Sequence, residues 1–213
     1  MTIELDHFFI LTGPGAPQAE LLSEIGLIEG TPNDHPGQGT ANRRFFFADS
    51  MLELAYVQDT NEAVNGPGSR LRIAERAANA GTSPFGIVVR ASQESALEPF
   101  PGWCYRPDYL ENGKYFHIGE NSGLLEEPLC IYVPFKLPAA TGQPLPADPF
   151  TSVTEICISV PVSHPSVVLE TLAQCERISL RLNEPHRLEI VFNQGKQGNF
   201  RDLRPDLPLL IRW

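Results

Sequence analysis

The chain has 213 residues, a formal net charge of −10, 42% hydrophobic residues and 20% charged residues. This length and composition are typical of a globular protein that buries a sizeable core, as one large domain or two small ones. The acidic balance disfavours nucleic acid and anionic membranes as partners, because their phosphates would be repelled. No apolar run approaches the roughly 18 residues that are needed to span a bilayer.

The four cysteines lack the paired spacing of zinc-binding or redox motifs. Two of them, Cys130 and Cys157, lie within apolar runs and are predicted to be small core residues. The chain opens with Glu4 and Asp6 rather than with the basic and apolar regions of a secretory signal. We therefore expect a reduced, cytoplasmic protein.

The N-terminal part of the chain predicts a strand, a helix and three more strands. Alternating apolar residues indicate the strands, and Gly26 follows the helix as a stop signal. The segment 31–41 is rich in glycine and proline and predicts a loop. The expected elements are a strand at 3–11, a helix at 17–25 and strands at 27–30, 43–48 and 51–57.

A helix is then expected over about 69–80, with Gly81 just past its end. The middle of the chain predicts four strands, as if the same unit recurred with its helix reduced to a turn: 85–91, 103–106, 114–118 and 129–135. The proline-rich segment 137–149 predicts a linker. The remaining elements are expected to be a strand at 152–160, a helix at 165–174 and strands at 177–182, 187–192 and 208–213.

A short echo between the two ends of the chain favours an internal repeat. Leu52-Glu53-Leu54 resembles Leu188-Glu189-Ile190. The order β-α-β-β-β appears near both stretches. We therefore predict paired βαβββ modules over 1–136, a linker over 137–150, and an additional βαβββ-like unit over 151–213 that packs on the same domain.

A histidine and a glutamate within apolar strands are the strongest chemical signals. His7 lies in the strand 3–11, and Glu53 alternates with Leu52 and Leu54, so its side chain points away from theirs. An imidazole and a carboxylate that converge on one sheet face can hold zinc, manganese or iron. A buried histidine bonded to a carbonyl, and a glutamate that faces solvent, are the structural alternatives.

Three stretches resemble the vicinal oxygen chelate superfamily and, within it, the glyoxalase-like domain proteins. The first is His7 with the helix that ends in Ile25-Gly26-Leu27. The second runs from His35 through Pro36-Gly37-Gln38-Gly39-Thr40-Ala41-Asn42 into the strand that precedes Glu53. The third is the C-terminal segment Arg201–Trp213.

The resemblance implies an α+β fold in which βαβββ modules form a half-open barrel around a divalent metal ion, with two ligands from each module. His7 and Glu53 match the two ligands of the first module. The second module departs from the pattern, because its matching positions fall in Phe85-Gly86-Ile87 and Ile131-Tyr132-Val133. His117, in the strand 114–118, is the best available third ligand, and a surface histidine is the alternative.

Other residues are predicted to bind the substrate. His35 and the glycines after it are predicted to shape a loop that lines the pocket, and two interpretations of this loop stay open. Its amides and imidazole meet a substrate oxygen, or it is a structural turn in which the glycines have positive φ. Asn42 and Arg43 lie at its base, and an inward arginine would suit a substrate carboxylate. Arg106 is predicted to help position the substrate.

We predict that the protein is a metal-dependent lyase, isomerase or dioxygenase that acts on a small molecule with adjacent oxygens. The metal ion (Zn, Mn, Fe or Ni) would act as a Lewis acid, with Glu53 as the possible base. A metal-free protein that sequesters a small molecule is the alternative, and the absent second-module ligands favour it. A homodimer is expected, because βαβββ units often pair between chains.

Overall fold

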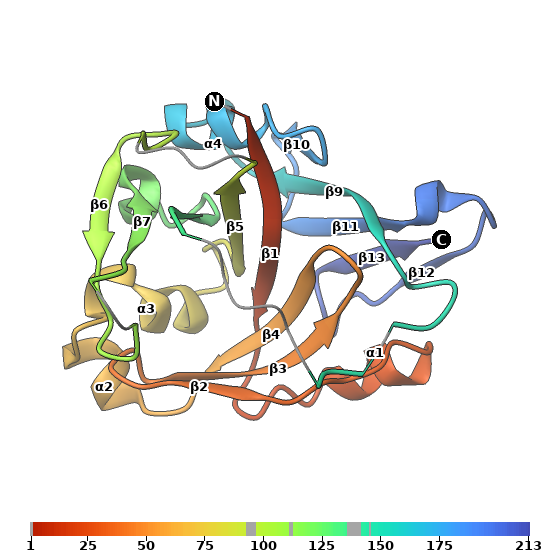
Figure 1. The fold of residues 1–213 in the computed structure, drawn as a ribbon, viewed down its shortest axis with the longest axis horizontal. Helices are drawn as coiled ribbons and strands as arrows, with labels where there is room; N and C mark the ends of the chain where they lie inside the picture. Colours follow the sequence, from red (N-terminus) through yellow and green to blue (C-terminus); the bar gives the residue numbers. More distant parts are fainter. Residues whose placement is uncertain (1, 93–96, 111–112, 136–141, 145) are drawn as a thin grey trace.

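The structure, a computed structural model, describes residues 2–92, 97–110, 113–135, 142–144 and 146–213. It is a mixed α+β fold that consists mostly of sheet, as predicted. An eight-stranded sheet curls into a half-barrel, and a five-stranded sheet packs against it (Figure 1). The described helices are all too short or too polar to cross a membrane.

The first module comprises β1 (Ile3–Leu11), α1 (Ala19–Glu24), β2 (Asn33–His35), β3 (Thr40–Phe46) and β4 (Met51–Val57). Its strand order is β2-β3-β4-β1, with β4 parallel to β1. The strand expected over 27–30 is reduced to one bridge at Glu29. The second strand of the module is instead β2, inside the expected loop, where it pairs with the start of β3.

The second module comprises β5 (Phe85–Ala91), β6 (Gly102–Tyr105), β7 (Phe116–Gly119), the 3-10 helix η2 (Glu120–Gly123) and β8 (Leu129–Val133). Its strand order, β5-β8-β7-β6 with β8 parallel to β5, repeats that of the first module. Strands β1 and β5 pair antiparallel and join the modules into one sheet. The repeat predicted for the middle of the chain is therefore present.

The connection between the modules contains α2 (Thr60–Asn65), the 3-10 helix η1 (Ser69–Leu71) and α3 (Ile73–Ala78). The single helix expected over 69–80 is broken at Arg72, whose φ of 58° lies in the left-handed region. The sequence pattern did not predict α2, which is short and polar. It begins at an N-cap, Asp59, whose side chain accepts a hydrogen bond from the Glu62 backbone N–H.

The C-terminal unit comprises β9 (Val153–Val160), α4 (Val167–Leu172), β10 (Ile178–Leu182), β11 (Arg187–Phe192), the 3-10 helix η3 (Asn193–Gly195), β12 (Phe200–Asp202) and β13 (Leu209–Arg212). Its strand order is β10-β9-β11-β13-β12. Strand β10, which follows helix α4, pairs with the first strand, β9. In the two modules the last strand, β4 or β8, holds this place beside the first strand. Glu189, the echo of Glu53, is buried and forms ion pairs with Arg181 and Arg212.

The five-stranded sheet covers the outer face of the half-barrel. Phe8 and Ile10 of β1 share one core with Ile156 of β9 and Ile190 of β11, and helices α1 and α4 contribute to it. Polar contacts reinforce this packing. Arg177 donates to an Asp49 carboxylate oxygen at 2.6 Å, and the Glu127 carboxylate accepts from the Ser166 backbone N–H at 2.7 Å and its Oγ at 2.6 Å. The predicted linker lies partly outside the described residues.

Candidate functional site

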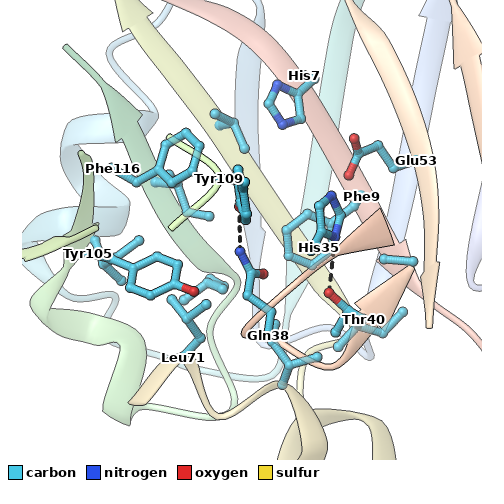
Figure 2. Close-up of a pocket in the computed structure, with 17 residues that line it drawn as sticks. His7, Phe9, His35, Gln38, Thr40, Glu53, Leu71, Tyr105, Tyr109 and Phe116 are labelled. Atoms are coloured by element: carbon cyan, nitrogen blue, oxygen red, sulfur yellow. Dashed lines mark hydrogen bonds between the residues drawn. The ribbon is translucent and has the colours of Figure 1, made fainter. Parts of the chain in front are cut away.

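A cavity of about 100 Å³ lies inside the curl of the eight-stranded sheet, where the two modules meet. This is the scale of an engineered apolar cavity that takes up benzene. His7, Glu53 and His35 lie on one side of it, Tyr105 and Phe116 lie on the other, and Tyr109 lies between them (Figure 2). The residues that line it are mostly apolar, and His7, His35 and Glu53 form the polar group on one side.

His7 faces this cavity because of a β-bulge in β1. Leu5 pairs with Val89 and His7 pairs with Val88, so Asp6 is an extra residue without a partner in β5. Before the bulge, Ile3 and Leu5 enter the core beneath the second sheet; after it, the odd-numbered residues from His7 onward face the cavity. The bulge therefore reverses which face the odd-numbered residues occupy.

The extra residue of the bulge also orients the His7 ring. Asp6 Oδ1 lies 2.7 Å from His7 Nδ1, which leaves Nε2 as the ring nitrogen without a hydrogen bond in the described part of the chain. Burial lowers the pKa of His7, but the hydrogen bond to Asp6 and the charge of Glu53 outweigh it, and the pKa is raised above 6.5. The imidazolium form is therefore favoured.

Glu53 enters the cavity from β4. It pairs with Phe9 of β1, and cross-strand neighbours point to the same face of a sheet. The side chain is 7% exposed, and no described group donates a hydrogen bond to its carboxylate. A buried carboxylate without a hydrogen bond is unusual, so this group is available to a cation or a hydrogen-bond donor.

His35 reaches the cavity through a loop that this chain holds in place itself. The Glu62 carboxylate accepts hydrogen bonds from the backbone N–H groups of Gly37 at 2.9 Å and Gly39 at 2.8 Å. Both glycines have positive φ, and a Cβ at Gly39 would lie 2.3 Å from a backbone oxygen of α2's N-cap. The interpretation in which these amides meet a substrate oxygen is therefore wrong, because Glu62 occupies them.

The pKa values of the two cavity histidines are shifted in opposite directions from that of a free histidine. The pKa of His35 is lowered below 6.5, because burial outweighs the attraction of Glu53. Its Nδ1 lies 3.0 Å from the Thr40 hydroxyl (Figure 2). Two titratable groups in one site with pKa values displaced in opposite directions are typical of a proton donor and a proton acceptor.

Two tyrosines from the second module close the cavity. The Gln38 amide donates to the Tyr109 hydroxyl at 2.6 Å, and this bond links the two modules across the cavity (Figure 2). Burial raises the pKa of Tyr109 and raises that of Tyr105 to about 12. Within the described residues, the buried Tyr105 hydroxyl has no hydrogen-bond partner of good geometry. The Gln38 side chain lies within reach of it; because that amide already donates to Tyr109, the Tyr105 hydroxyl keeps hydrogen-bonding capacity for a ligand.

The second module offers no counterpart to His7 and Glu53. Phe9 pairs with Glu53 in the first module, and the matching pair in the second is Val88 with Ile131. The place of Glu53 is therefore held by Ile131. The place of His7, two residues before Phe9, is held by Gly86, and a Cβ there would lie 2.0 Å from the Phe9 ring. The Phe9 ring therefore fills the space beside Gly86.

The other predicted site residues do not line the cavity. Asn42 shares the cavity face of β3 with Thr40 and pairs with Ala55, but it is buried, and its side-chain oxygen accepts from the Asn33 backbone N–H. The Arg43 side chain projects to the outer face of β3, where it forms ion pairs with Glu29 and Glu20. Its prediction as a cavity residue was wrong, because Arg44 rather than Arg43 shares the cavity face with Glu53.

Arg106 and His117 also lie elsewhere. Arg106 is exposed, with its guanidinium 5.2 Å from the centre of the Tyr115 ring. His117 alternates with Phe116 and Ile118, which line the cavity, so its ring projects from the opposite face of β7. Its expected place beside His7 and Glu53 was wrong. The apolar character of its two neighbours was the signal that could have predicted this face.

Comparisons with known proteins bear on the fold alone. No family model matches the chain, and no curated protein matches it. A hypothetical protein from Staphylococcus aureus has a similar structure, with a TM-score of 0.56 and 9% identity over 100% of this chain and 99% of that one. The hypothetical protein BH1468 from Bacillus halodurans C-125 aligns with a TM-score of 0.41 and 15% identity over 66% of this chain and 100% of that one.

Proposed function

We propose that the protein is of the vicinal oxygen chelate type and that its cavity binds a small molecule with an apolar body and oxygen atoms at one end. Two βαβββ modules around one cavity support the family. The position of His7, His35 and Glu53 on one side, facing a mostly apolar wall, supports the ligand. An apolar wall with a few convergent polar groups is typical of small-molecule sites.

The four-ligand metal centre of this superfamily does not fit the chain. Gly86 and Ile131 hold the second-module positions, and neither carries a ligand atom. The Phe9 ring lies against the first of these positions. This observation carries the proposal that the cavity binds its ligand without such a centre.

The polar groups suit a ligand with two neighbouring oxygens. His7, with its raised pKa, would donate a proton or a charged hydrogen bond to one oxygen. His35, with its lowered pKa, and Glu53 would accept from a hydroxyl. The Tyr105 hydroxyl, which has no well-aligned hydrogen bond in the described structure, would meet a polar group at the other end of the molecule. A hydroxy acid or a catechol meets these requirements.

A metal-dependent lyase, isomerase or dioxygenase is the second candidate. In both cavity histidines Nδ1 has a hydrogen-bond partner and Nε2 has none among the described residues. Outer partners of this kind orient metal-binding imidazoles, and two imidazoles with one carboxylate are a known ligand set for iron. In the described residues, however, these three donor groups do not meet the 4.8 Å mutual spacing expected of one ion. Side chains would have to move.

The experiment that separates these candidates is a ligand screen by thermal shift and calorimetry, on protein freed of metal and kept in chelator. Catechols, hydroxy acids and dicarbonyl compounds are the panel. We expect a ligand that stabilises the metal-free protein, and we expect Glu53→Gln to abolish the shift while Arg43→Gln, on the outer face, retains it. Binding that appears only after manganese, iron, nickel or zinc is added would overturn the metal-free proposal in favour of the second candidate.

A further inference from the structure

A second group of metal-binding side chains lies on the face of the sheet opposite the cavity. Cys104 of β6 pairs directly with His117 of β7, and Glu98 comes from the loop that precedes β6. The Cys104 sulfur, a His117 ring nitrogen and a Glu98 carboxylate oxygen lie within 4.8 Å of one another. Within the part of the chain that the structure describes, this is the group of three such residues that meets that spacing.

The hydrogen bonds of His117 determine which nitrogen is available. Nε2 lies 2.8 Å from the Phe100 carbonyl oxygen, which can only accept, so Nε2 carries the proton. In a neutral ring the other nitrogen, Nδ1, then carries a lone pair and can only accept. Nδ1 lies 3.1 Å from a Glu98 carboxylate oxygen, which also can only accept. Two acceptors at this distance need a proton or a metal ion between them.

This unsatisfied nitrogen is buried, so water does not satisfy it from the solvent. The His117 side chain is 2% exposed, and Nδ1 has no hydrogen bond of good geometry in the described structure. The ring fits there because residue 102 is glycine: a Cβ at Gly102 would lie 2.7 Å from Nε2. A buried ring nitrogen without a well-aligned hydrogen bond, on an imidazole that lies within 4.8 Å of a carboxylate and a thiol, is an arrangement expected of a metal ligand.

The arrangement does not suit a cysteine nucleophile with a histidine base. Such a relay uses both ring nitrogens, one toward the thiol and one toward the carboxylate. Here the backbone of Phe100 occupies Nε2, and Glu98 lies at Nδ1. Convergence of donors, rather than a relay through the ring, is what the geometry provides.

We propose that Cys104, His117 and Glu98 form a zinc site, with water as the fourth ligand. Thiolate, imidazole and carboxylate are the ligands that zinc takes, and three protein ligands plus water are a known set for this ion. Tyr115 donates to the Glu98 carboxylate at 3.3 Å and would orient it. The ion would tie the loop at Glu98 to the edge hairpin β6–β7 (Figure 1). The sheet separates this site from the cavity, so the proposal is independent of the cavity's function.

The test is a cobalt titration of the full-length, metal-free protein, followed by competition with zinc. Cobalt bound to a thiolate gives a charge-transfer band in the near ultraviolet. We expect this band at one equivalent and its displacement by zinc. Cys104→Ser should abolish the band and weaken zinc binding by more than the roughly 10–100-fold that loss of an outer partner costs.

Matched variants keep the result interpretable. Glu98 is partly exposed, so Glu98→Gln should fold normally and weaken zinc binding while keeping the thiolate band. His7→Ala removes the cavity imidazole and should leave the band unchanged. If wild-type protein gives no band, Nδ1 of His117 is satisfied by a proton and the proposal is wrong. A band that persists in Cys104→Ser would also overturn it.

Discussion

The two modules of the eight-stranded sheet have the same strand order, but the side chains at matching positions are polar in the first module and apolar in the second. In the first, His7 and Glu53 project into the cavity from β1 and β4; in the second, Gly86 and Ile131 hold the corresponding places in β5 and β8. The missing side chain at Gly86 is used for packing, because the Phe9 ring lies against it. A repeated backbone can thus provide one polar wall and one apolar wall, so a ligand with one polar end can bind in only one orientation.

The largest effect is expected where the apolar wall is packed most tightly. Gly86→Ala should lower the free energy of unfolding by about 1–3 kcal/mol, because the new Cβ overlaps the Phe9 ring. Chemical denaturation would measure this. Gly81→Ala is the matched control, since nothing lies within 4 Å of a Cβ there. If Gly86→Ala and Gly81→Ala have equal effects, the packing argument is wrong.

The first module's loop offers the next test. Glu62→Ala removes the acceptor of two backbone N–H groups and should cost about 1.5 kcal/mol. It should also weaken ligand binding, because the loop carries His35 and Gln38. The measurement is denaturation together with calorimetry of a ligand identified in the screen. Retained affinity at reduced stability would show that the loop does not contribute to the site.

Because the hydrogen bond from Gln38 goes to Tyr109, replacing each of the two tyrosines should have a different effect on stability. Tyr109→Phe loses the hydrogen bond from Gln38 and should cost about 1 kcal/mol. Tyr105→Phe should cost less, because among the described residues its hydroxyl has only a poorly aligned contact with Gln38. Thermal unfolding of both variants checks this. Equal losses would contradict the assignment of the bond to Tyr109.

The smallest effect concerns pH. Because the pKa of folded His7 is raised above 6.5, its stabilisation is fully present below pH 6.5 and is lost as pH rises through the folded pKa. His35 acts oppositely: its pKa is lowered, so acidification below 6.5 destabilises the folded protein. An NMR titration of the imidazoles should show both directions. Asp6→Asn should lower the pKa of His7 and leave that of His35 nearly unchanged; a His7 pKa that did not move would exclude Asp6 as a cause.

Long apolar patterns made much of the fold predictable. The bounds expected for β1, β4, β5 and β11 match the structure, because their apolar runs are continuous and buried. The helix α2 was missed because Ala63 is its only buried residue among polar ones. The strand order of the C-terminal unit was also beyond prediction, since pairing depends on contacts distant in sequence.

The site was partly predictable for similar reasons. His7, His35 and Glu53 were expected near one another, and the structure brings them to one cavity. Tyr109 was missed because it lies in a loop with no periodic pattern. The bulge at Asp6 was hidden as well, because one inserted residue in an apolar strand leaves no compositional trace.

The shared core beneath the second sheet has a consequence for how the protein unfolds. Phe8 of β1 and Leu188 of β11 belong to one cluster, so the half-barrel and the C-terminal unit are not separate units of stability. Amide hydrogen exchange should find β1, β5, β9 and β11 opening together in a single cooperative event. A fragment ending near residue 136 would expose the outer face of its sheet and aggregate. The cavity and the sheet behind it therefore belong to one cooperative folding unit.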